Sequence, residues 1–246
     1  MFIELVDSLR CPRVHDDTWL VASVTRFDGR FIVEGSLGCP ICRQQYPVHR
    51  GVVDFTTLAG NSSAERGAEQ PGESGVEPGL APSVDLGLAP SAQAGLGPHA
   101  HPLSPASDDH VMRAAALLGL DDAGGVILLG GRHGLMAAAL EALSPARALL
   151  FNPGPNVPLG AGVSAMRSDG TVPMAVGSVR GALVDESSTR IDMLEGLVRA
   201  LRPSGRLVAP AATPLPLGVR ELARDAREWV AIADGVTSAP VPIRRA

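Results

Sequence analysis

Two cysteines in the first quarter of the chain have the spacing of a metal-binding turn. Cys39 and Cys42 are separated by two residues, so their thiolates can occupy two corners of a tetrahedron around zinc. A third cysteine, Cys11, lies upstream beside a proline. An odd number of cysteines favours a metal site in a reducing compartment over a set of disulfides.

A glycine-rich stretch in the second half of the chain could bring its backbone close to a ligand. Gly130, Gly131 and Gly134 follow a short apolar run, where a turn would lead from a strand into a helix. Backbone amides at such a turn can bind a ligand at the carboxyl ends of parallel strands. The alternative is that the glycines only permit a tight turn. His133, in the same turn, could serve as a general base.

The elements that must position these residues fall into segments of different composition. Most aromatic residues lie within residues 1–58, where strand-like segments around 19–24 and 31–35 separate the cysteines. Residues 59–107 are rich in glycine, proline, alanine and serine, which predicts a disordered linker. Residues 108–246 alternate between strand-like and helix-like patterns. This alternation predicts an α/β domain with a doubly wound, mostly parallel sheet.

Within the α/β segment, apolar runs and helical periodicity predict the individual elements. Helices are expected at 108–118, 135–143 and 191–201, and strands at 126–129, 147–151, 163–166, 181–184 and 207–209. The tail from 219 to 231, followed by 236–243, is expected to supply a last helix and edge strands. Arg220, Arg224 and Arg227 have helical spacing, which predicts a solvated face on that helix.

The composition excludes several classes of function. The chain has 246 residues and a net charge of −5, so nothing in the overall charge indicates binding to nucleic acid or to an anionic membrane. Every basic residue is an arginine, which excludes Schiff-base chemistry and a phosphate-loop lysine. The sequence has no apolar run long enough to cross a bilayer and does not begin like a secretory signal. We therefore expect a cytoplasmic protein.

Residues 1–58 resemble the small zinc-ribbon family that includes the activator subunit of tRNA and protein methyltransferases. The motifs that carry the resemblance are Cys11-Pro, Gly-Cys39-Pro-Ile-Cys42 and a Tyr46-Pro-x-x-x-Gly-Val segment. The resemblance implies a small β-rich module that holds a structural zinc ion. It also implies an edge strand that can extend the sheet of a methyltransferase, either a partner protein or the second half of the same chain.

One position departs from the ribbon pattern, because the family's second cysteine corresponds to Val14 in this sequence. His15 follows directly and is the expected fourth ligand, since imidazole and thiolate both suit zinc. Asp16, Asp17 and His49 are weaker candidates. The alternative is a ribbon that has lost its metal and keeps its cysteines as buried thiols.

Residues 108–235 resemble the class I S-adenosylmethionine-dependent methyltransferases. The resemblance rests on the order of the elements and on an Arg-Pro-Ser-Gly-Arg turn at 202–206, before the fifth strand. It implies a site for S-adenosylmethionine at Gly130, Gly131 and Gly134, with Asn152 on the ribose and Asp169 on the adenine. No catalytic residue is assigned. Asp185 and Glu186, after the fourth strand, are either substrate-binding or catalytic groups or the first charges of the next helix.

The family motif is incomplete at the expected cofactor site. Leu128 and Asn152 stand where the family has acidic residues, and Arg132 replaces the middle glycine. These departures favour a non-catalytic or regulatory protein, a pseudoenzyme with an activator-type ribbon. The alternative is an active methyltransferase with a variant site. An Arg132 side chain inside the strand-end crevice would favour the first hypothesis, and one outside it would favour the second.

Overall fold

The computed structural model describes residues 1–56, 107–121, 123–160 and 162–234. These residues belong to one compact unit. The predicted linker lies outside the described residues apart from residue 107, and so does the predicted edge strand at 236–243. None of the helices in the described part of the chain combines the length and the apolarity needed to cross a membrane.

Residues 1–56 form a short helix and an antiparallel meander, which we call the ribbon. The helix α1 (Ile3–Val6) precedes the strands β1 (Val21–Asp28), β2 (Phe31–Gly38), β3 (Gln45–His49) and β4 (Val52–Asp54). Each of these strands pairs antiparallel with the next. In β3, buried Tyr46 and Val48 alternate with exposed residues, as expected for a strand with one solvated face.

Residues 107–234 form an α/β unit. Its helices are α2 (Asp108–Leu118), α3 (Ala137–Leu143) and α4 (Ile191–Ala200), with short 3₁₀ segments at Gly131–Met136 and Glu186–Ser188. Its strands are β5 (Gly125–Gly130), β6 (Ala146–Phe151), β7 (Ser164–Arg167), β8 (Val179–Leu183), β9 (Leu201–Pro210), β10 (Val219–Arg224) and β11 (Glu228–Ala233).

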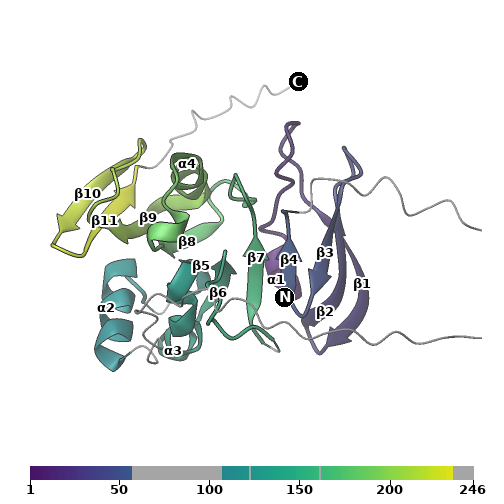
Figure 1. Ribbon diagram of the computed structural model, residues 1–246, viewed down its shortest axis with the longest axis horizontal. Helices are drawn as coiled ribbons and strands as arrows, with labels where there is room; N and C mark the ends of the chain where they lie inside the picture. The colour runs from purple at the N-terminus through teal and green to yellow at the C-terminus, as the bar shows by residue number, and fades with distance from the viewer. Residues whose placement is uncertain (57–106, 122, 161, 235–246) are drawn as a thin grey trace, which may run out of the picture. The chain divides into compact units, whose positions relative to one another are not determined.

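Both halves share one mixed sheet of 11 strands, in the order β1-β2-β3-β4-β7-β6-β5-β8-β9-β11-β10 (Figure 1). The strands from β4 through β7, β6, β5 and β8 to β9 are parallel. The seam between the halves is the β4–β7 pair, in which Val53 lies opposite Met166. The amide of Phe55 continues the seam by donating to the carbonyl of Arg167 at 2.9 Å. The fold is therefore mixed α/β with a large sheet.

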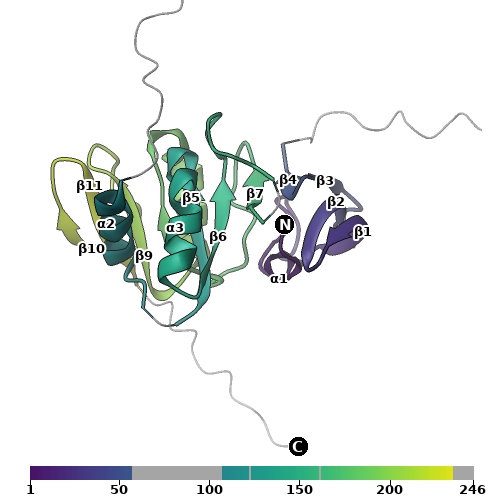
Figure 2. The ribbon, with the colours of Figure 1, turned by 90° about the horizontal axis from the view of Figure 1, so that it is seen from below.

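The helices cover both faces of the α/β part of the sheet. α2 and α3 lie on one face (Figure 2). In β5, Ile127 belongs to the core that contains Leu118 of α2, whereas Leu128 belongs to the core that contains Leu194 of α4. Successive residues of a strand point to opposite faces, so α4 packs on the second face. Leu5 of α1 belongs to the same core as α4, which means that the N-terminal residues complete it.

The helix predicted over 219–231 is wrong, because β10 and β11 occupy this segment as an antiparallel hairpin. β11 also pairs antiparallel with β9. Trp229 is fully buried, and its indole N–H donates to the carbonyl of Thr213 at 2.8 Å. Burial of this side chain against β9 outweighs the helical spacing of the arginines. Arg220 and Arg224 consequently lie on an exposed edge strand, and Arg224 pairs with Glu221.

Candidate functional site

Four potential metal ligands converge beside β2 and β3. The ligand atoms of Cys11, His15, Cys39 and Cys42 all lie within 4.8 Å of one another. The Sγ atoms of Cys11 and Cys42 are 3.7 Å apart, and the Sγ of Cys39 is 3.4 Å from Nε2 of His15. Around a tetrahedral zinc ion these edges would be about 3.8 Å and about 3.5 Å, given bonds of about 2.3 Å to sulfur and 2.0–2.1 Å to nitrogen. The geometry thus fits a four-coordinate ion that this chain alone would hold.

Tight backbone geometry positions the two cysteines of the knuckle. Cys39 follows the last residue of β2, and its amide and carbonyl bond to Gln44 and Arg43 at 2.9 Å each. The amide of Cys42 donates to the Sγ of Cys39 at 3.5 Å. Burial alone would raise the pKa of Cys39, but hydrogen bonds from the amides of Cys42 and Ile41 lower it. The turn therefore favours the thiolate that a metal requires.

The other two candidate ligands come from the loop between α1 and β1. The amide of Cys11 bonds to the carbonyl of Thr18 at 3.3 Å, and its Sγ lies 3.1 Å from the hydroxyl of Tyr46. Burial raises the pKa of Cys11. Nδ1 of His15 lies 2.7 Å from the carbonyl of Asp16, so an Nδ1–H donor would leave Nε2 free for a metal. Val14, at the family's cysteine position, is fully exposed.

The weaker candidates lie outside this cluster. Asp17 pairs with Arg10 at 3.7 Å, and His49 contacts Glu34 at 2.9 Å on β2. The contact of Asp16 with the cluster is made by its backbone carbonyl, which lies 2.7 Å from Nδ1 of His15. Among the described residues, the set of Cys11, His15, Cys39 and Cys42 is the group with the geometry of a metal site.

The second candidate site lies at the carboxyl ends of β5 and β8, which are adjacent strands of the parallel sheet. The glycine turn follows β5 directly, and Gly131 adopts a φ of +57°. The buried Asp185 follows β8 and accepts a hydrogen bond from the amide of Arg132 at 2.7 Å. The same carboxylate accepts from the amide and the hydroxyl of Ser187. A backbone amide of the turn is thus bound to a carboxylate of this chain.

The space beside each glycine of the turn is occupied by other residues of the chain. A Cβ at Gly131 would meet Oδ2 of Asp185 at 2.0 Å, and one at Gly134 would meet Val157 at 2.8 Å. At Gly130 the nearest atom, in Val184, would lie 3.0 Å away. Contacts under 3.0 Å cannot be accommodated without a shift of the backbone or of the neighbour. Gly131 and Gly134 therefore permit packing between the turn and the chain around it.

Asn152 is bonded to the neighbouring strand end. It follows β6 with a φ of +46°, a conformation that asparagine tolerates better than most residues. Its Oδ1 accepts from the amide of Ser168 at 2.8 Å, and its Nδ2 donates to the carbonyl of Ser168 at 2.9 Å. These two hydrogen bonds thus continue the pairing of β6 with β7 by one more residue pair. Ser168 was not identified from the sequence, although a polar residue at the end of β7 is a natural partner for Asn152.

The remaining polar residues of this edge are exposed or only partly buried. The Arg132 side chain lies at the surface and contacts Glu186 at 3.5 Å, so it does not fill the crevice. Asp169 is exposed in the bend after β7. Burial lowers the pKa of His133, while the negative charge of Asp185 acts in the opposite direction. The lowered pKa favours the neutral imidazole at pH 7.

Comparisons with known proteins give only distant structural similarity. No family model matches the chain, and no curated protein matches it. It is similar to geranyl diphosphate C-methyltransferase from Streptomyces coelicolor A3(2), with 17% identity over 41% of this chain and 42% of that chain and a TM-score of 0.34. It is also similar to the antibiotic-resistance methyltransferase Kmr, with 15% identity over 50% of this chain and 91% of that chain and a TM-score of 0.36.

A third similar structure is the phosphoethanolamine N-methyltransferase 2 of Haemonchus contortus, with 14% identity over 44% of this chain and 29% of that chain and a TM-score of 0.34. The match thus spans 42% of the length of the geranyl diphosphate C-methyltransferase and less than a third of this one. Several of these neighbours are bound to S-adenosylmethionine or to S-adenosylhomocysteine. Identities and scores this low leave the function to be argued from the residues of the chain itself.

Proposed function

We propose that this chain is a non-catalytic, methyltransferase-like protein whose α/β half acts as a scaffold and whose ribbon is held by zinc. The observation that carries the proposal is the hydrogen bond from the amide of Arg132 to Asp185. A cofactor at the glycine turn would need that amide and the space beside Gly131. Both are taken by the Asp185 carboxylate.

The strand order supports descent from a methyltransferase fold. If β5 is counted as the first strand of the α/β half, the order across the sheet is 3-2-1-4-5-7-6. The first five positions match the doubly wound order of dinucleotide-binding folds. The seventh strand is inserted antiparallel beside the fifth. A fold of this kind places its ligand site at the carboxyl ends of β5 and β8.

The state of Asn152 also argues against a cofactor at this edge. A ribose hydroxyl needs a free acceptor, and an ionised acid bonds it more strongly than a neutral amide does. Both polar atoms of Asn152 are bonded to Ser168. The side chain is therefore held by Ser168 and offers a ribose hydroxyl one remaining lone pair and one remaining N–H, without a negative charge. These residues fit S-adenosylmethionine less well than an acidic residue would, and we derive no methyl transfer through it.

The ribbon has the contacts of a structural module rather than of a catalytic one. Its expected ligands, Cys11, His15, Cys39 and Cys42, fill all corners of a tetrahedron and leave no open position for a substrate. The pairing of β4 with β7 uses the sheet edge through which a ribbon would otherwise join a separate methyltransferase. We propose that the ribbon docks within the chain and that zinc, when bound, fixes its shape. This proposal treats residues 1–58 and 108–246 as two domains joined by a linker.

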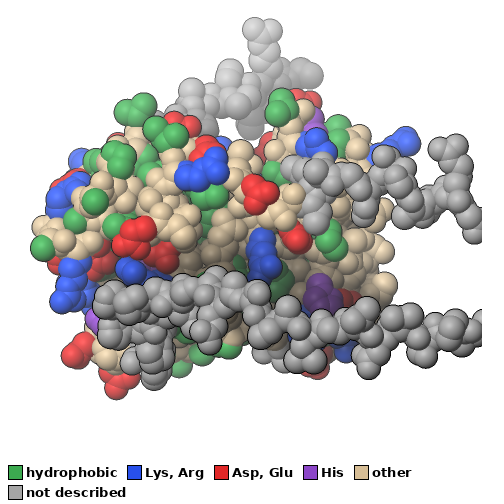
Figure 3. Space-filling view, in the orientation of Figure 1, with side chains coloured by type: hydrophobic (Ala, Val, Ile, Leu, Met, Phe, Trp, Pro, Cys, Tyr) green, Lys and Arg blue, Asp and Glu red, His purple; other side chains and the backbone are tan. Residues whose placement is uncertain are grey.

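An active methyltransferase remains the second candidate, because the Arg132 side chain lies outside the crevice. In that account the Asp185 carboxylate would bind the cationic amino group of the cofactor. Acidic and basic side chains are interspersed over the face shown in Figure 3, and this face has no extended basic patch that would bind nucleic acid.

Reduced cysteines in a zinc site fit our proposal of a cytoplasmic location.

Calorimetric titration of the folded, full-length protein tests the proposal. We expect no saturable binding of S-adenosylmethionine or S-adenosylhomocysteine, with any Kd weaker than about 1 mM. The hydrogen bonds of Asp185 and Asn152 would have to break before either ligand could enter. A Kd near 1 μM, about 8 kcal/mol of binding free energy, would overturn the proposal, because it would mean that the site accommodates the cofactor and that a methyl acceptor should be sought. Cooperative thermal unfolding of the same sample confirms that it is folded.

A further inference from the structure

A cavity on the ribbon is lined by residues that belong to neither candidate site. It has a volume of about 450 Å³ and lies between the β1–β2 hairpin, the turn between β3 and β4, and Gly160 in the loop before β7. Cavities of about 300–1,000 Å³ are typical of sites for small organic ligands. It is separate from the cysteine cluster, because its lining contains none of the expected metal ligands.

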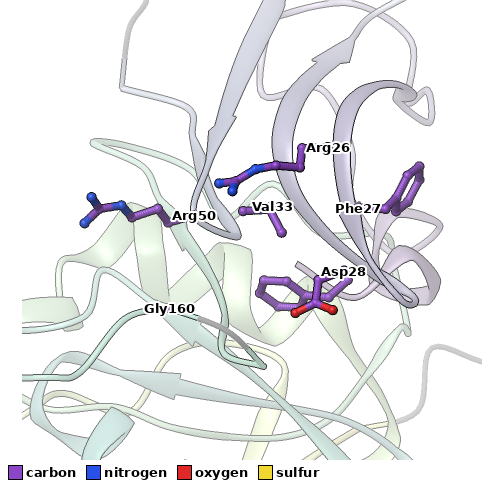
Figure 4. A pocket seen from close by; sticks show the side chains of 7 residues that line it. Arg26, Phe27, Asp28, Val33, Arg50 and Gly160 are labelled. Atoms are coloured by element: carbon purple, nitrogen blue, oxygen red, sulfur yellow. The ribbon is translucent and has the colours of Figure 1, made fainter.

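Two arginines on the cavity wall have unused hydrogen-bonding capacity. The side chain of Arg50 makes no ion pair with any other residue in the described part of the chain. Arg26 contacts Glu34 at 3.3 Å, but Glu34 is also bound to His49 at 2.9 Å. In Figure 4 the Arg26 side chain lies over Val33, whereas the Arg50 side chain extends outward at the edge of the labelled group. Guanidinium groups favour a carboxylate or another planar anion as a partner.

The floor of the cavity is apolar and well fixed. Phe31 is buried at 4% exposure, and its ring packs edge-on against Phe2 at 5.3 Å between centroids. A Cβ at Gly51 would meet the Phe31 ring at 2.2 Å, so this glycine leaves the space that the ring occupies. Val33 adds an aliphatic surface beside it. Such a floor can pack against the hydrophobic body of a ligand.

The backbone of Arg50 has a conformation that is unfavourable for an arginine. Arg50 and Gly51 have φ values of +50° and +79° and form the two-residue turn between β3 and β4. Asparagine followed by glycine is the preferred pair for such a turn. An arginine with positive φ costs free energy that asparagine would largely avoid, and strain of this kind is concentrated at functional sites. The turn thus places Arg50 on the wall of the cavity at the expense of stability.

We propose that this cavity binds a small organic monoanion, a carboxylate with an aromatic or aliphatic body. The body would pack on Phe31 and Val33, and the carboxylate would bind Arg50 and Arg26. Asp28 also lines the cavity, and its negative charge disfavours a ligand with several charges, such as a di- or triphosphate. This site is independent of the strand-end crevice and does not rest on the proposed function.

Calorimetric titration of the full-length protein with 2-naphthoate, and with the neutral 2-naphthamide as its isostere, tests the proposal. We expect naphthoate to bind one site per chain and naphthamide to bind about tenfold more weakly or not at all, a difference of at least ~1.4 kcal/mol. Equal affinity for the two compounds, or no saturable binding of naphthoate at millimolar concentration, would overturn the assignment.

The variant Arg50→Asn separates a binding role from a structural one. It should weaken naphthoate binding about tenfold or more while the protein unfolds at the same temperature or a higher one, because asparagine suits the turn better. Arg43→Asn is the matched control, since Arg43 also has a positive φ, of 60°, but lies outside the cavity. We expect that control to bind naphthoate like the parent. Unchanged binding by the Arg50 variant, or equal loss in both variants, would contradict the proposal.

Discussion

Replacing Cys39 with serine is expected to remove zinc from the protein and to lower its free energy of unfolding by about 4 kcal/mol or more. Cys39 is a buried ligand of the cluster, and backbone amides of its own turn favour its thiolate. The free energy of metal binding to such a site is folding free energy. Elemental analysis for zinc and urea denaturation of parent and variant measure the two effects.

Two further variants test which residue supplies the fourth ligand. His15→Ala should lose zinc, because Nε2 of His15 faces the Sγ of Cys39. Val14→Ala is the control, since Val14 is fully exposed although it stands at the family's cysteine position. It should retain about one zinc ion per chain. A fully zinc-loaded His15 variant, or a Cys39 variant with parental stability, would show that the cluster is not the structural site we describe.

Replacing Phe55 with alanine is expected to destabilise both halves of the protein together, by about 3–5 kcal/mol. Phe55 is 1% exposed, and its ring lies 4.7 Å from that of Tyr46, between centroids. Its amide also bonds to Arg167 at the end of β7. Because Phe55 belongs to the same core as Trp229, a cavity at the seam should lower the stability of the entire unit.

The two tryptophans of the chain allow this coupling to be measured. Trp19 lies exposed in the ribbon, and Trp229 lies fully buried in the α/β half. In a Trp19→Phe background, urea denaturation followed by Trp229 fluorescence should show a lower midpoint when Phe55 is replaced. Phe27→Ala is the control, because Phe27 is 50% exposed and its loss should change stability by no more than about 0.5 kcal/mol. An unchanged Trp229 transition in the Phe55 variant would mean that the halves unfold independently.

Local patterns predicted the knuckle and most of the parallel sheet, and the resemblance to zinc ribbons predicted Cys11 and His15 as the other ligands. Cysteine spacing indicated the knuckle at Cys39 and Cys42, and the structure places Cys11 and His15 beside it. Zinc binding itself stays a prediction. The buried parallel strands are short apolar runs bounded by glycine and proline, so each is visible without knowledge of its partners. β5 and β6 accordingly begin within one residue of their predicted starts, at Gly125 and Ala146.

Features that depend on distant partners could not be predicted in the same way. The segment around Trp229 has helical charge spacing, and only its pairing with β9 makes it a strand. Gly131 looked like a ligand-binding glycine, whereas the structure places the Asp185 carboxylate in the space beside it. Asn152 looked like a weakened ribose ligand, and its bonds to Ser168 depend on the pairing of β6 with β7. Side-chain partners 16 or 53 residues away in the sequence leave no periodic signal.

Nuclear magnetic resonance of the backbone amides, recorded during titration with S-adenosylhomocysteine, tests the central claim most directly. The claim is that Asp185 and Asn152 already bond the amides of Arg132 and Ser168 at the strand-end crevice. The amides of Arg132 and Ser168 should therefore exchange slowly with solvent and should not shift at millimolar ligand. Saturable shifts of the Arg132 and Ser168 amides at micromolar ligand would contradict the claim and identify an open cofactor site.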